Sequence, residues 1–182
     1  KDTMALLRIA EVANVPQRIV ESVVSVNEGR KRNMVRRIVQ ACGGSVRGSK
    51  IAILGVTFKP NTDDIRDSPS LVIIPALQAE GAVIQAHDPE GMSAASQELP
   101  GVNWCDDAYA AMDGADAVVI LTEWNVFRSL DLEQARQLLR RPIVIDLRNV
   151  YEPRDMIAAG FSYSSIGRPS TNPVWEPEEE VA

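Results

Sequence analysis

Short apolar runs alternate with helix-like segments between residues 50 and 165, and this alternation limits the possible folds more than any other feature of the sequence. The runs that we predict to be strands are 51–55, 82–86, 102–104, 117–121, 143–146 and 161–164. Most of them are apolar at successive positions, which is typical of a sheet covered on both faces. Helix-capping residues such as Ser68 and Asp131 lie between them. We therefore predict an α/β fold with a Rossmann-like, doubly wound parallel sheet.

The first 42 residues are predicted to be helical, because their apolar residues recur at steps of three and four. Pro16 suits the first turn of the second helix, and Gly43–Gly44 would end it. Two helices cannot form a core alone, so their apolar stripes must pack on the rest of a longer chain, on a second copy, or on both. We favour both, and expect a homodimer built on residues 1–42.

The pattern divides the chain into three parts. We predict a central helical dimerisation segment at residues 1–47, an α/β domain at 48–168, and a flexible tail rich in Pro and Glu at 169–182.

Composition excludes several classes of protein and of site. The net charge of −6 argues against a nucleic-acid partner, and the basic residues between 30 and 37 are interpreted as a solvated helix face. Every apolar run is far shorter than the roughly 20 residues of a membrane-spanning helix, so no membrane partner is expected. Cys42 and Cys105 are interpreted as reduced thiols of a cytoplasmic protein. Neither has a Cys or His at metal-ligand spacing, and His87 is the only histidine, so no metal site is expected.

Open α/β sheets bind ligands outside the carboxyl ends of their strands, which here selects the loops at 56–69, 87–91, 122–128 and 147–151. The first loop follows a single glycine, Gly55, and therefore lacks the G-x-G-x-x-G dinucleotide fingerprint. It offers Lys59 and the start of a helix, a combination that suits a phosphate. The alternative is a polar turn with local Asp–Arg pairs.

Three residues in the other loops also permit two interpretations each. Asp88 could bind a ribose hydroxyl, or it could simply form a turn with Pro89. Trp124 could line a base or sugar, or it could pack against the core. Arg148 is well placed for a phosphate, or it could form a salt bridge with Asp146.

Several segments taken together are more specific than any of these signals. They are KDT at 1–3, VNE at 26–28, GSKIAILG at 48–55, TFKPNTDDIRDSP at 57–69, DP at 88–89, LTEW at 121–124, FR at 127–128 and DLRN at 146–149. In this order they resemble the UDP-glucose/GDP-mannose dehydrogenase family over residues 1–168, and the members that act on UDP-glucose in bacteria look most similar.

The resemblance implies a two-domain enzyme that oxidises the C6 alcohol of UDP-glucose to a carboxylate with two NAD, through a thioester-type intermediate on a cysteine. The family motif Cys-Phe-Pro-Lys-Asp places that cysteine just upstream of Lys1, so this chain is expected to be the carboxy-terminal part and to bind the UDP portion of the UDP-sugar substrate. Neither cysteine of the chain matches that motif.

The resemblance also assigns individual residues. Asp2 matches the catalytic aspartate that helps to activate water for thioester hydrolysis. Lys1 and Arg66 match positions near the NAD cofactor. The substrate-binding positions are Phe58, Lys59 and Arg148. The alternatives are a related GDP-mannose or UDP-N-acetyl-mannosamine dehydrogenase, or a nucleotide-sugar-binding and dimerisation module without catalytic activity of its own.

Overall fold

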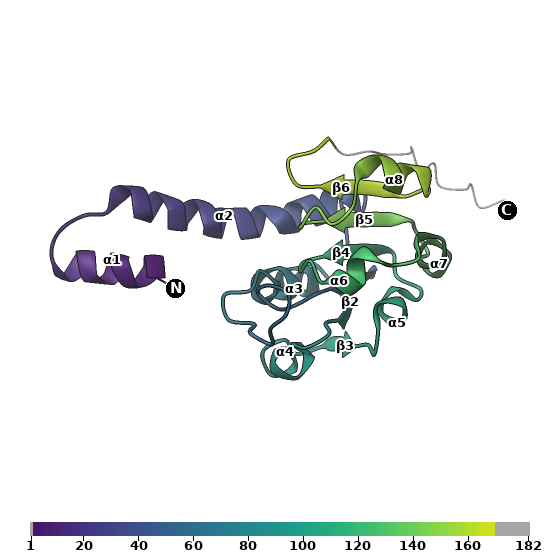
Figure 1. Ribbon diagram of the computed structural model, residues 1–182, viewed down its shortest axis with the longest axis horizontal. Helices are drawn as coiled ribbons and strands as arrows, with labels where there is room; N and C mark the ends of the chain where they lie inside the picture. The colour runs from purple at the N-terminus through teal and green to yellow at the C-terminus, as the bar shows by residue number, and fades with distance from the viewer. Residues whose placement is uncertain (1, 170–182) are drawn as a thin grey trace.

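The computed structural model describes residues 2–169, in which a single six-stranded sheet forms the centre (Figure 1). Its strands are β1 (Lys50–Leu54), β2 (Val83–His87), β3 (Val102–Trp104), β4 (Ala117–Ile120), β5 (Ile143–Asp146) and β6 (Ser162–Ser165). All neighbouring pairs are parallel, in the order β3-β2-β1-β4-β5-β6. This is the strand order of a doubly wound Rossmann-type sheet, and it confirms the predicted fold class.

Helices cover both faces of the sheet. They are α2 (Arg18–Ala41), α3 (Ser70–Ala79), α4 (Met92–Glu98), α5 (Ala108–Met112), α6 (Asn125–Arg128), α7 (Leu132–Leu138) and α8 (Pro153–Ala158). Because successive strand residues point to opposite faces, β1 contributes Ile51 and Ile53 to one buried cluster, and Ala52 and Leu54 to the other. The first cluster packs under α2, α3 and α4, and the second under α5, α6, α7 and α8.

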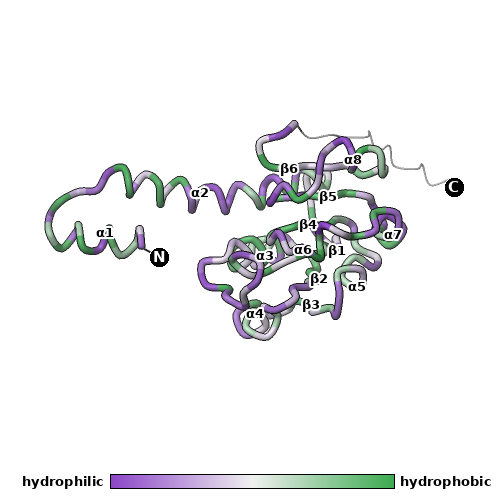
Figure 2. Tube along the Cα trace, viewed as in Figure 1, coloured by the Kyte–Doolittle hydropathy of each residue, from purple (hydrophilic) through white to green (hydrophobic). Residues whose placement is uncertain are grey.

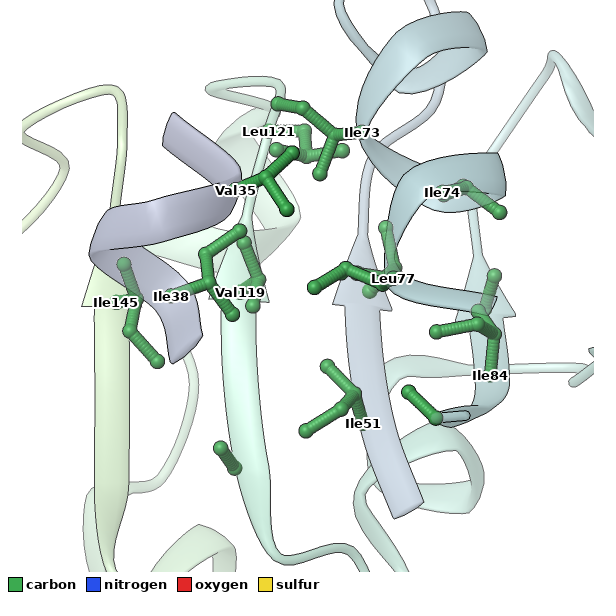
Figure 3. Packing of buried hydrophobic residues seen from close by; sticks show 14 of the residues in the cluster. Val35, Ile38, Ile51, Ile73, Ile74, Leu77, Ile84, Val119, Leu121 and Ile145 are labelled. Carbon is green, nitrogen blue, oxygen red and sulfur yellow. The ribbon is translucent and has the colours of Figure 1, made fainter. Parts of the chain in front are cut away.

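The carboxy-terminal turns of α2 belong to the core of the α/β body (Figure 3). Val35 and Ile38 are buried against Val119 of β4 and Ile145 of β5, beside α3. This half of the helix is therefore fixed to the sheet by apolar burial, while the division of the chain at residue 47 stays a prediction.

The other half of α2 extends away from the sheet, and α1 (Asp2–Val12) folds back along it (Figure 1). The turn between the two helices contains Asn14, whose φ is 53°, a left-handed conformation that asparagine tolerates better than most residues. Apolar residues lie along the whole hairpin (Figure 2), and two of the large ones, Val12 and Ile19, are more than 80% exposed.

The elements agree closely with the predicted ones, with two exceptions. Helix α4 was not predicted, because Ala95 is the only residue of its seven that is buried and its sequence lacks an apolar stripe. Helix α6 has only four residues and was predicted as part of a loop. The predicted acidic tail lies outside the described residues from position 170 onward.

Candidate functional site

The ligand edge of this sheet is centred between β1 and β4, where the strand order changes direction. Two loops meet there, the one that follows β1 and the one that follows β4. Their approach requires Gly55, whose φ is +87° and at which a Cβ atom would lie 2.5 Å from the Cβ of Thr122. The hydroxyl of Thr122 donates a 2.6 Å hydrogen bond to the carbonyl oxygen of Thr57, which ties the two loops together.

Asp88, at the carboxyl end of β2, lies at the centre of this edge and is fully buried. Its Oδ2 accepts hydrogen bonds from the Val56 amide at 2.7 Å, from the Thr57 amide and hydroxyl at 3.1 Å each, and from the Trp124 indole at 3.1 Å. Its Oδ1 accepts from the amides of Glu90 at 3.0 Å and Gly91 at 2.7 Å. Burial alone would raise the pKa of Asp88, but the backbone hydrogen bonds outweigh it and hold that pKa below its ordinary value.

These contacts decide between the two interpretations of Asp88, and likewise between the two interpretations of Trp124. Asp88 binds the protein's own donors rather than standing free for a ribose hydroxyl, so the structure supports a structural role. Trp124 is 6% exposed and packs in the second buried cluster, so it is a core residue with a polar edge rather than a wall of an open site.

Phe58 and Lys59 directly follow these contacts and are exposed. The amide of Phe58 donates to the carbonyl oxygen of Asp64 at 2.9 Å, which closes the loop on itself. In the described part of the chain, the Lys59 ammonium forms no hydrogen bond and no ion pair. The loop therefore presents a free cation at the ligand edge.

Arg66 lies in the same loop, and its guanidinium contacts both carboxylate oxygens of Asp64, at 2.8 and 2.7 Å. The side chain of Arg66 is 74% exposed. The local Asp–Arg pair that the sequence allowed is therefore present, and Arg66 would have to leave Asp64, or share it, to contact a cofactor.

Arg148 follows β5 and forms an ion pair with Glu123 of the loop after β4. The predicted alternative, a salt bridge with Asp146, is wrong: the carboxylate of buried Asp146 accepts instead from the amide of Arg148 at 2.9 Å, and from the amides of Val150 and Tyr151. Glu123 could reach Arg148 because β4 and β5 are neighbours in the sheet. Although burial would raise the pKa of Glu123, the hydrogen bond from Arg148 lowers it below the ordinary value.

The sequence-predicted residues thus fall into two groups. Phe58, Lys59 and Arg66 lie in the loop after β1, and Arg148 follows β5 at the same edge of the sheet, whereas Asp2 is exposed in the first turn of α1. In Figure 1 that end of α1 is turned back toward the α/β body. Lys1 lies outside the described residues.

A groove of about 550 Å³ lies elsewhere, between α2 and strands β5 and β6, and contains none of the predicted site residues. Arg37 on its rim donates to the hydroxyl of Ser164 at 3.0 Å and to the carbonyl oxygen of Ser165. Part of the basic stretch of α2 therefore fixes the helix to the sheet.

Two kinds of feature are absent from residues 2–169. No group of three or more His, Cys, Asp or Glu side chains could hold a metal ion. No helix among these residues is long and apolar enough to cross a membrane.

Comparison with known proteins adds to this geometry. The profile of the UDP-glucose/GDP-mannose dehydrogenase family, UDP binding domain, matches residues 52–153. The chain belongs to this family. It is 49% identical to a UDP-glucose 6-dehydrogenase of Rhizobium meliloti, with 93% of this chain aligned to 39% of the relative. It is 43% identical to a UDP-glucose 6-dehydrogenase of Bacillus subtilis, with 93% of this chain aligned to 37% of that protein.

Solved structures agree with the sequence relatives. A UDP-glucose dehydrogenase from Pyrobaculum islandicum superposes with a TM-score of 0.74 at 30% identity, covering 90% of this chain and 35% of that one. An NDP-N-acetyl-D-galactosaminuronic acid dehydrogenase from Methanosarcina mazei gives the same TM-score at 29% identity, covering 92% of this chain and 37% of that one. The chain therefore spans somewhat more than a third of the length of these proteins.

Proposed function

We propose that this chain binds the UDP portion of the substrate within an NAD-dependent UDP-glucose 6-dehydrogenase, which oxidises UDP-glucose in two steps to UDP-glucuronate. The observation that carries the proposal is the pair of cations at one sheet edge, Lys59 after β1 and Arg148 after β5, in a chain that matches the family's UDP binding domain. The names of the relatives that align with 93% of the chain support UDP-glucose as the substrate.

The charges of the site fit a diphosphate. The chain as a whole is acidic, so an anionic ligand needs fixed cations at the place where it binds. Lys59 is a free point charge that can turn toward a phosphate, whereas Arg148 presents a planar fork held in place by Glu123. A charge-assisted hydrogen bond from either one is worth roughly 1.5–3 kcal/mol, and the ligand must compete with Glu123 for Arg148.

The residues of this domain do not fit NAD as its own ligand. Only Gly55 follows β1 where a dinucleotide fold has a glycine-rich turn, and Asp88 at the end of β2 is already engaged by the protein's own donors. NAD is proposed as the cofactor of the whole enzyme. On the family resemblance, Arg66 would contact the cofactor, and Lys1 would lie near it.

The roles of two other residues are proposed on the family resemblance. Asp2 would help to activate water for hydrolysis of the acyl-enzyme; its exposed position in the first turn of α1 leaves it accessible to a second domain. Phe58 would contact the UDP-sugar beside Lys59, and its side chain is 50% exposed at the ligand edge.

We also propose a homodimer through residues 1–42. The hairpin of α1 and α2 exposes apolar side chains over its length, including Ile9, Val12, Ile19, Val23 and Val26. Exposed apolar surface of this extent is unusual in a monomer, and a second copy related by a two-fold axis would cover it with the same residues. The proposed compartment is the cytoplasm, in keeping with the free thiols of Cys42 and Cys105.

The binding proposal is tested by titrating UDP into the protein and its variants. We expect Lys59→Ala and Arg148→Ala each to weaken UDP binding by about tenfold to a hundredfold. Arg154→Ala is a matched control, because Arg154 is 89% exposed on α8 and outside the site. If both site variants are folded and bind UDP as tightly as the parent protein, the cationic site is refuted.

The choice of substrate needs a separate assay. The natural full-length protein should form NADH with UDP-glucose, and much more slowly with GDP-mannose or UDP-N-acetyl-mannosamine. Faster turnover with either of the latter would assign the chain to a different branch of the family. UDP binding without any NADH formation would favour a non-catalytic binding module.

A further inference from the structure

Lys59 and Arg148 can act on one ligand only if something fixes the distance between their loops. They follow β1 and β5, and β4 lies between these two strands. The loop after β4, which carries Glu123 and Trp124, therefore lies between the loops of the two cations at this edge of the sheet. Its contacts decide how the two cations are placed.

Asp88 joins that loop to the one that carries Lys59. Its Oδ2 holds the amide and hydroxyl of Thr57, two residues before Lys59, and the indole N–H of Trp124. The indole also donates to the Thr57 hydroxyl at 3.2 Å, so the three side chains contact one another. Because the carboxylate is fully buried, no solvent competes for these bonds.

The connection continues to the second cation. Glu123 precedes Trp124 in the chain and holds the guanidinium of Arg148. A continuous series of contacts thus runs from the backbone beside Lys59, through Asp88 and Trp124, to Arg148.

We infer that Asp88 and Trp124 are positioning residues of the UDP site, which fix the loops of Lys59 and Arg148 relative to each other before the ligand binds. This inference rests on the proposed function and adds two residues that need not touch the ligand. In a dinucleotide-binding domain, an acid at the end of the second strand binds the ribose. Here the same position acts inside the protein, so the ribose of UDP must be recognised by other groups.

The test replaces Trp124 by Phe, which keeps the aromatic packing and removes the N–H donor. Asp88 keeps its other donors, so the variant is expected to fold. Trp104→Phe is the matched control, because Trp104 lies in the edge strand β3 and is half-buried. Thr57→Val removes the hydroxyl contacts of the same cluster and serves as an independent variant.

Calorimetric titration with UDP gives the first readout. We expect Trp124→Phe and Thr57→Val each to raise the dissociation constant by about threefold to tenfold, and Trp104→Phe to leave it unchanged. In the natural full-length enzyme, the KM for UDP-glucose should rise while the KM for NAD stays constant. A merely structural role would lower the melting temperature without this selective change.

The outcomes separate the two claims. If the parent protein does not bind UDP, the proposed function is overturned, and the inference falls with it. If the parent binds UDP and the folded Trp124→Phe and Thr57→Val variants bind it equally well, the positioning role is overturned while the proposed function stands.

Discussion

Replacing Gly55 by Ala should be among the most destabilising single changes in the α/β body, for two separable reasons. The backbone at Gly55 has φ +87°, a conformation that costs a residue with a Cβ atom about 1–2 kcal/mol. The added Cβ would also lie 2.5 Å from the Cβ and 2.8 Å from the backbone nitrogen of Thr122. These atoms belong to the backbone or are attached to it, so no side-chain rotation relieves the overlap.

Gly44 offers a control that isolates the first reason. Its φ of +93° is nearly the same, but a Cβ added there would meet nothing within 4 Å. Gly44→Ala should therefore cost only the conformational term of about 1–2 kcal/mol. Gly55→Ala should cost about 2–5 kcal/mol in total, since overpacking typically adds a further 1–3 kcal/mol.

Urea unfolding and thermal melting of the three proteins measure the difference. For a chain of this length, 1 kcal/mol corresponds to roughly 2–4 °C in Tm. Gly55→Ala should thus melt about 4–20 °C below the parent, and Gly44→Ala about 2–8 °C below it. Equal losses in the two variants would refute the close approach of the loops after β1 and β4.

Three other predictions concern stability, assembly and catalysis. The backbone hydrogen bonds hold the pKa of folded Asp88 below its ordinary value. The contribution of Asp88 to the free energy of unfolding is therefore present above about pH 4 and is lost as the pH falls through the folded pKa. Urea unfolding from pH 7 to pH 3 should show this loss of stability at the acid end, and Asp88→Asn should remove the pH dependence. Val23→Glu places a charge in the exposed apolar stripe of α2 and should convert a dimer to monomers in sedimentation velocity; an unchanged dimer would move the interface elsewhere. In the natural full-length enzyme, Asp2→Asn should lower kcat while UDP affinity stays within about twofold of the parent; a normal rate with lost affinity would contradict its proposed role.

The strands and most helices could be predicted because their signals are local. β4 and β5 are apolar at successive positions because both of their faces are buried. The start of α7 could be predicted because Asp131 is a typical N-cap residue, and its side chain accepts hydrogen bonds from the amides of Glu133 and Gln134. Helix α4 lacked such signals, since Ala95 is the only buried residue of the helix.

The contacts of the candidate site were harder to predict, because their partners are distant in the sequence. Lys59 and Arg148 could be placed at one edge from the carboxyl ends of their strands alone. The partner of Arg148 could not be predicted in this way. Asp146 is only two residues away in the sequence, but its carboxylate accepts hydrogen bonds from backbone amides. The ion pair is formed instead by Glu123, from the loop after the neighbouring strand β4. The donors to Asp88 come from three separate loops, which only the folded sheet brings together.

The position of Asp88 also gives a physical reason for the missing glycine-rich turn. In dinucleotide-binding domains, the backbone amides after the first strand face the pyrophosphate, and glycines allow the ligand to approach them. Here the amides of Val56 and Thr57 point to the Asp88 carboxylate instead, at 2.7 and 3.1 Å. With those donors occupied, an anionic ligand at this edge has to be neutralised by side chains. We propose Lys59 and Arg148, from the loops after β1 and β5, as the cations for this purpose. On this proposal, the buried aspartate and the two cations are parts of a single change from backbone to side-chain recognition of phosphate.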